Sequence, residues 1–117
     1  GGGGGDDAVS HLCDSLRALE KLCCCWRNVC VLEEMGCVDV LVGIAKDRTV
    51  PEMGHIHAAR CILQMCASPA GHTSPMFKKS RLVHLNSLER HKSARVRRLA
   101  SASLFLHATL HPHALSR

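Results

Sequence analysis

Aromatic residues are scarce in this chain of 117 residues. They make up 3% of it, as Trp26, Phe77 and Phe105, and tyrosine is absent. A β-sandwich or β-barrel usually contains more aromatic and β-branched residues, so the composition favours packed helices. The length allows one modest hydrophobic core and excludes two independent ones.

Long apolar runs are also lacking. No stretch approaches the roughly 18 apolar residues of a membrane span, and no charged start precedes an apolar run as in a signal peptide. We therefore expect a cytoplasmic and/or nuclear protein. The glycine-rich residues 1–7 predict a flexible lead-in. Because the chain starts at Gly1 without a methionine, a fragment of a longer protein is one expectation.

Acidic residues almost disappear from the second half of the chain. Residues 1–58 hold five Lys/Arg and nine Asp/Glu, whereas residues 59–117 hold ten Lys/Arg and only Glu89. The two halves therefore carry formal charges of −4 and +9. A basic half of this kind attracts an acidic peptide, a nucleic-acid backbone or an anionic surface.

The eight cysteines lack the spacing of a structural zinc site. The gaps from Cys25 to Cys30 and from Cys61 to Cys66 are five residues, which a helix does not bring onto one face. We interpret the cysteines mainly as small buried hydrophobic residues, with metal and redox roles as the alternatives. Cys61 and Cys66 in particular are expected to be buried thiols without a metal.

The histidine pairs and the catalytic residue types form no recognised motif. His55 with His57, and His111 with His113, are not accompanied by further metal ligands in a matching pattern. The chain also contains no nucleophile elbow, phosphate-binding loop or metalloprotease motif. We therefore expect a protein that is not an enzyme and needs no cofactor.

An internal repeat is the strongest pattern in the sequence. Residues 15–23, 58–66 and 99–107 align with one another at offsets of 43 and 41 residues. Residues 36–44 and 80–88 align at an offset of 44. Helical solenoids repeat every 40 to 47 residues or so, which indicates stacked helical units.

Local signals agree with helical units. Leu12, Leu16 and Leu19 recur at three- and four-residue steps, as an amphipathic helix requires. Gly36 interrupts the helical pattern and predicts a left-handed turn between two short helices. Pro51 predicts the start of the next helix.

Two segments resemble parts of an armadillo repeat. Residues 28–45 resemble its first two helices, in which a short helix ends at a glycine and turns sharply into a second one. Residues 58–66 resemble the third helix, whose pattern is roughly Ala-Ala-x-Ala-Leu-x-Asn-Leu-Ala. The resemblance implies an all-α, right-handed armadillo-like solenoid of about two and a half three-helix repeats. The implied division is a partial repeat over 8–25, a repeat over 26–70, a degenerate repeat over 71–110 and a tail over 111–117.

The resemblance also implies a site. Third helices of armadillo proteins line a concave groove that binds extended peptides, often through an asparagine and, in importin-alpha-like proteins, a tryptophan one turn before it. Here three of the six corresponding positions are cationic, namely Arg17, Lys21 and Arg60. The resemblance therefore implies an acidic ligand, as in beta-catenin-like grooves, and a protein–protein interaction scaffold. The alternative is that these charges are ordinary solvated helix residues. The candidate ligand-binding residues are Arg17, Lys21, Arg60, Gln64 and Phe105.

A dense basic run marks the start of the last helical segment. Its members, Lys92, Arg95, Arg97 and Arg98, form a candidate basic patch. A solvated helix face, an acidic protein partner, and a nucleic acid or membrane surface are the three interpretations. No aromatic residues are interleaved for base stacking. Two alternatives to a peptide scaffold therefore stay open: a basic helical module that binds nucleic acid or an anionic surface, and a structural part of a longer array whose partners are further repeats.

Overall fold

The computed structural model describes residues 3–67 and 79–110, and within these ranges it contains helices and turns but no strand. The predicted all-α class is therefore confirmed. The helices are α1 (Gly3–Leu22), α2 (Trp26–Glu34), α3 (Cys37–Lys46), α4 (Glu52–Ala67), α5 (Lys79–Leu88) and α6 (Ala94–Leu110).

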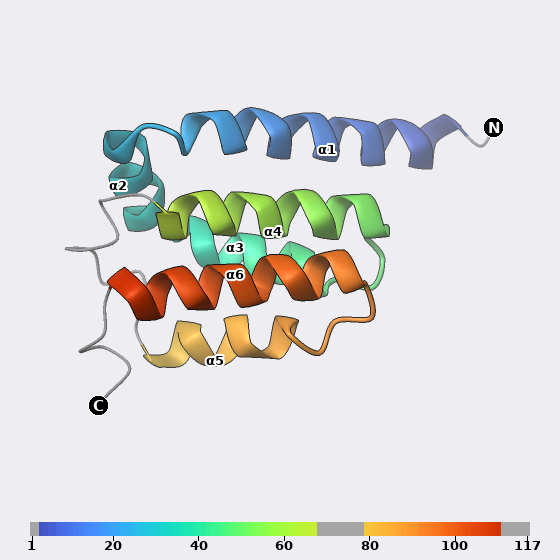
Figure 1. The fold of residues 1–117 in the computed structure, drawn as a ribbon. Helices are drawn as coiled ribbons and strands as arrows, with labels where there is room; N and C mark the ends of the chain where they lie inside the picture. The colour runs from blue at the N-terminus through green and yellow to red at the C-terminus, as the bar shows by residue number, and fades with distance from the viewer. Residues whose placement is uncertain (1–2, 68–78, 111–117) are drawn as a thin grey trace.

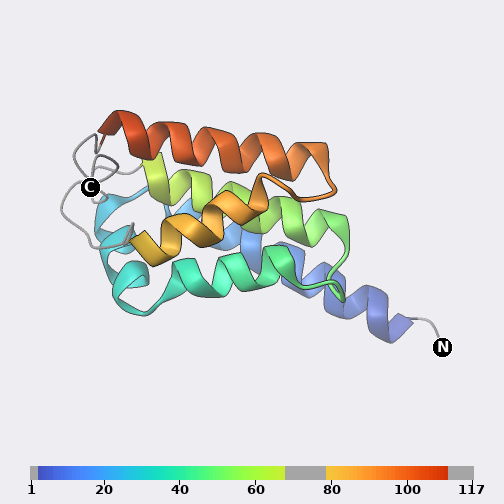
Figure 2. The same cartoon turned by 90° about the horizontal axis from the view of Figure 1, so that it is seen from below.

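The longer helices form two layers. Helices α1, α4 and α6 run parallel and side by side, with α4 in the middle (Figure 1). Helices α3 and α5 run antiparallel to them and pack against α4 and α6 respectively (Figure 2). The short helix α2 crosses one end of the molecule and contacts α3. Contacts between α3 and α5 complete the second layer.

Helix α4 is the centre of the core because it is covered on three sides, by α1, α3 and α6. Its apolar side chains Ile62 and Met65 are almost fully buried. They share one core with Leu41 of α3 and with Leu85 and Leu88 of α5. Burial of a side chain of this size is worth about 1.5 to 3 kcal/mol, so this layer of contacts supplies much of the stability.

The internal repeat correctly marked the helices. The aligned segments 58–66 and 99–107 lie within α4 and α6, and 15–23 lies on α1 except for its last residue. In the aligned pair, 80–88 lies within α5, and 36–44 lies on α3 except for its first residue. The aligned leucines 41 and 85 are both buried in the core. The offsets of 43 and 41 residues therefore relate α1, α4 and α6, which lie in one layer. The offset of 44 residues relates α3 and α5, which lie in the other layer.

Two glycines and a proline shape the connections. Gly36 has a φ of 79°, so the predicted left-handed turn between α2 and α3 is confirmed. Pro51 immediately precedes α4, and its carbonyl accepts hydrogen bonds from the amides of Gly54 and His55. A Cβ at Gly54 would collide with the Val50 side chain, so this first turn of α4 requires glycine.

The chain start differs from the prediction. Residues 1–7 are expected to be a flexible lead-in, but α1 begins at Gly3. Glycine costs about 1 kcal/mol per residue in a helix, yet extending an existing helix is far easier than nucleating one. The same helix ends at Leu22, so Cys23 and Cys24 lie in a turn beyond it. The predicted tail 111–117 and the start of the third unit, residues 71–78, lie outside the described residues.

Helix length and composition also bear on membranes. Within residues 3–67 and 79–110, no helix is both long and apolar enough to cross a bilayer.

Candidate functional site

The exposed stripe of α4 borders a groove shared with α6 and α1. Burial of α4 against three neighbours leaves Arg60 exposed and Leu63 and Gln64 half-buried on one face. Arg60 and Gln64 lie four residues apart, so they stand one helical turn from each other. We call this cavity of about 410 Å³ the α4–α6 groove. Its lining residues are Glu20, Ile56, Arg60, Leu63, Gln64, Arg95, Arg98 and Leu99.

Three guanidinium groups and one carboxylate face this groove. The carboxylate of Glu20 on α1 accepts a hydrogen bond from Arg60 Nη2 at 3.2 Å, and its side chain is only 18% exposed. Arg60 is 48% exposed, so its guanidinium retains access to solvent. Arg95 and Arg98 on α6 bring two further cations, which leaves the groove with an excess of positive charge.

The imidazole of His57 lies close to this charge. His57 is buried, and its Nδ1 has no hydrogen-bond partner. Burial lowers the pKa of His57, and the guanidinium groups of Arg60, Arg17 and Arg95 lower it further, while Glu20 opposes them. Guanidinium groups on three helices therefore make this side of the molecule electropositive.

Glu20 is a groove residue that the sequence reasoning missed. A signal was present, because Leu16 on α1 and Cys23 in the turn directly after it are buried, and Glu20 lies four residues after one and three before the other. The Cys23 amide still donates to the Leu19 carbonyl, so this spacing places all three residues on the same side of the helix and its last turn. A carboxylate on the face that contacts α4 predicts a cationic partner there.

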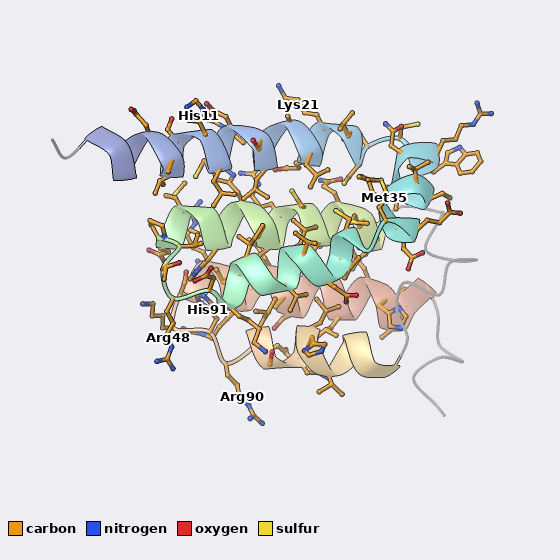
Figure 3. All side chains as sticks on the ribbon, turned by 180° about the vertical axis from the view of Figure 1, so that it is seen from behind. His11, Lys21, Met35, Arg48, Arg90 and His91 are labelled. Atoms are coloured by element: carbon orange, nitrogen blue, oxygen red, sulfur yellow. The ribbon has the colours of Figure 1, made fainter. Side chains whose placement is uncertain are left out.

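The other α1 candidates are not in the groove. The guanidinium of Arg17 pairs with Asp14, one turn earlier on the same helix, and both side chains are more than half exposed. Lys21 is exposed and points away from α4 (Figure 3). The two cations expected to stack with Arg60 therefore do not line the same cavity. Phe105 of α6 is 69% exposed and also lies outside the groove lining.

The candidate basic patch divides into three parts. Arg95 and Arg98, three residues apart, share the helix face that borders the α4–α6 groove. Arg97 points elsewhere and donates hydrogen bonds to the carbonyls of His91 at 2.7 Å and Lys92 at 3.0 Å. Lys92 precedes α6 and lines a different cavity. All four side chains are exposed, and Arg97 and Arg98 together border a further cavity at the start of α6.

A chain of hydrogen bonds joins the two turns that precede α4 and α6. The amide of Ser93 donates to Nδ1 of His91 at 2.9 Å, so this nitrogen is unprotonated. Nε2–H of His91 can then donate to Nδ1 of His55, also at 2.9 Å. Nε2–H of His55 donates in turn to the carbonyl of Asp47 at 2.7 Å. This arrangement satisfies every ring nitrogen while both imidazoles are neutral.

The cysteines fall into three groups, of which one, Cys13, Cys30 and Cys37, is partly buried. Cys23, Cys61 and Cys66 are buried, as a hydrophobic role predicts, and burial raises the pKa of Cys61 and of Cys66 to about 12. The thiol of Cys61 donates to the carbonyl of Leu16 at 3.1 Å, which links α4 to α1. Cys24 and Cys25 are exposed instead, because α1 ends before them. They depart from the interpretation of the cysteines as mainly small buried hydrophobic residues.

The described side chains are not arranged as a metal site. Within the described ranges, no group of three or more His, Cys, Asp and Glu side chains is placed to hold a metal ion. His55 is engaged in the chain of hydrogen bonds described above. The second predicted histidine pair, His111 and His113, lies outside the described residues.

Comparisons with known proteins give no match. No family model, no curated protein and no solved structure matches this chain.

Proposed function

We propose that this chain is an armadillo-like scaffold that binds an extended acidic protein segment in the α4–α6 groove. The observation that carries the proposal is the convergence of Arg60, Arg95 and Arg98 on one open cavity. Gln64 lies beside them, and its carboxamide can both donate to and accept from a peptide backbone. Parallel packing of α1, α4 and α6, the helices that resemble armadillo third helices, supports this reading.

Charge and shape favour a carboxylate-rich peptide. Arginine forms paired, charge-assisted hydrogen bonds with planar carboxylates, and two cations on α6 and one on α4 can engage successive acidic side chains. The apolar side chains Ile56, Leu63 and Leu99 provide contact area between these charges. Phe105 is the only aromatic side chain on α6, so a stacking platform for bases is not available on this helix.

The binding test uses a fluorescein-labelled peptide of ten glutamates and follows its fluorescence anisotropy. Arg60→Glu reverses a charge inside the groove, and we expect it to cost about 2 to 5 kcal/mol, or roughly 30-fold or more in affinity. Lys21→Glu makes the same change in net charge outside the groove and is the matched control. We expect it to weaken binding by less than about threefold, through long-range attraction only.

A single-stranded DNA of equal charge distinguishes the competing function. Groove binding predicts tighter binding of the glutamate peptide than of the DNA at physiological salt. Nucleic-acid binding predicts the reverse order, with an affinity that falls steeply with salt whatever the base sequence. Equal loss of peptide affinity in Arg60→Glu and Lys21→Glu would show that only net charge matters and would overturn the proposal.

A further inference from the structure

A second cavity lies at a corner of the molecule and shares no lining residue with the α4–α6 groove. It has a volume of about 550 Å³ and lies where the turn after α3 meets the turn between α5 and α6. In Figure 3, Arg48, Arg90 and His91 lie at the same corner, and the side chains of Arg48 and Arg90 extend outward from it. The polar side chains that matter to its chemistry are Lys46, Arg48, His55, Arg90, His91 and Lys92. We call it the corner cavity.

Four cations from two separate turns border the corner cavity. Lys46 and Arg48 come from the end of α3, and Arg90 and Lys92 come from the turn before α6. Among the described lining residues there is no carboxylate. The nearby Asp47 carboxylate instead accepts hydrogen bonds from the amide and hydroxyl of Thr49, at 2.9 and 2.7 Å. The cavity therefore has a strong positive potential that no lining acid offsets.

The two imidazoles of the hydrogen-bond chain also line the corner cavity. A second proton on His91 would direct Nδ1–H at the amide N–H of Ser93, which is itself a donor. The hydrogen bond from Ser93 therefore favours the neutral imidazole of His91 while the cavity is empty. An anion in the cavity supplies the opposite charge that makes protonation favourable.

The groups around His91 shift its pKa in opposite directions. Burial is the main cause that lowers its pKa, followed by His55, and Lys92 lowers it further. The Ala45 carbonyl and the Glu52 carboxylate, from α3 and α4, raise it. Lys46, Arg48 and Arg90 complete the set of cations at the cavity. Because cations predominate around His91, the charge of a bound anion favours uptake of a proton by this imidazole.

We propose that the corner cavity binds a ligand with more than one phosphate group, and that binding adds a proton to His91. Four cations on two facing turns match several phosphate oxygens, whereas one carboxylate would leave most of them unpaired. The volume is within the range of small-molecule sites, about 300 to 1,000 Å³. A free polyphosphate and a phosphorylated lipid headgroup share this chemistry. The site is independent of the acidic-peptide groove.

Isothermal titration calorimetry with inorganic tripolyphosphate at pH 6.5 and physiological salt tests the site. We expect the double variant Arg48→Gln/Arg90→Gln to weaken binding by about tenfold or more, since each arginine contributes charge-assisted hydrogen bonds. Arg27→Gln removes an exposed arginine on α2, away from the cavity, and is expected to leave the affinity within about twofold. The proposal would be overturned if Arg27→Gln weakened binding as much as Arg48→Gln/Arg90→Gln, or if neither variant changed the affinity.

The proton is measured by repeating the titration in buffers of different ionisation enthalpy. We expect net proton uptake in the wild-type protein and less uptake in His91→Gln. Imidazole ¹⁵N shifts of His55 and His91, recorded on the wild-type protein with and without tripolyphosphate, provide a readout that does not depend on the variant folding. Binding without proton uptake and without these shifts would contradict the histidine role.

Vesicles distinguish the two ligand sources. Stronger binding to phosphatidylinositol bisphosphate vesicles than to tripolyphosphate, lost in the double variant, would assign a lipid headgroup. Strong tripolyphosphate binding with no vesicle binding would assign a free ligand. Binding to phosphatidylserine vesicles of equal charge density, as tight as to the phosphorylated lipid, would show a general anionic attraction and refute phosphate selectivity.

Discussion

Replacing Glu20 with glutamine should raise the affinity of the α4–α6 groove for the glutamate peptide by about 5- to 30-fold. Glu20 lies 3.2 Å from the guanidinium of Arg60 and competes for it with any acidic ligand. Glutamine keeps the size of the side chain and removes its charge. The substitution therefore frees a cation without opening a cavity in the α1–α4 contact.

The magnitude follows from the position of the two charges. A ligand carboxylate on the free edge of Arg60 would lie roughly 5 Å from Glu20, where like charges repel by about 0.8 kcal/mol in water and about 3 kcal/mol at an effective dielectric of 20. Arg60 is 48% and Glu20 18% exposed, so the groove is between these limits. A gain of about 1 to 2 kcal/mol in binding is the expected result.

Affinity and stability should change in opposite directions. Loss of a half-exposed ion pair destabilises a protein by at most about 1 kcal/mol, so urea denaturation should show a small decrease. Anisotropy titration with the glutamate peptide measures the gain. Glu34→Gln, an equal charge change on an exposed residue of α2, is the control and should have much less effect on affinity. Unchanged or weaker binding by Glu20→Gln would refute a competitive role for this carboxylate.

Three further predictions concern the fold. Gly36→Ala should destabilise the chain by about 1 to 2 kcal/mol in urea denaturation, because an L-residue is strained at a φ of 79°; no loss would contradict that turn. Stability should fall from pH 7.5 to pH 5.5, because the lowered pKa values of His57 and His91 mean that the unfolded chain, titrating near 6.5, binds more protons. Each histidine contributes at most about 1.4 kcal/mol per pH unit, and a flat profile would exclude both. Native-state alkylation at pH 8 should modify Cys25, whose pKa is lowered by the amides of Asn28 and Arg27, well before buried Cys61, and equal rates would contradict the burial pattern.

Helix positions were predictable because they depend on local periodicity and on repeat offsets. The spacing of Leu12, Leu16 and Leu19 directs one face of α1 inward, and the alignment of Leu41 with Leu85 identified two equivalent helices. The turn at Gly36 was predictable because residues other than glycine rarely adopt the left-handed backbone conformation that it requires. All of these features are properties of short segments.

The lining of the α4–α6 groove was predicted only in part, because it depends on contacts between segments. Arg60 and Gln64 were candidates from the alignment and line the groove, but the pairing of Arg60 with Glu20 joins residues 40 positions apart. The contact between His55, in the first turns of α4, and His91 joins residues 36 positions apart. His91 lies in the irregular turn before α6, which has no period from which a side-chain direction can be derived. Helical geometry does explain why Arg95 and Arg98 share a face while Arg97 does not.

The location of the bound peptide is the most direct test of the proposed function. Amide shifts of the ¹⁵N-labelled wild-type chain, titrated with the glutamate peptide at physiological salt, report this location residue by residue. The account predicts the largest shifts at Arg60, Leu63 and Gln64 on α4 and at Arg95 and Arg98 on α6. Shifts concentrated instead at Arg48, Arg90 and Lys92, or spread evenly over all exposed lysines and arginines, would contradict it.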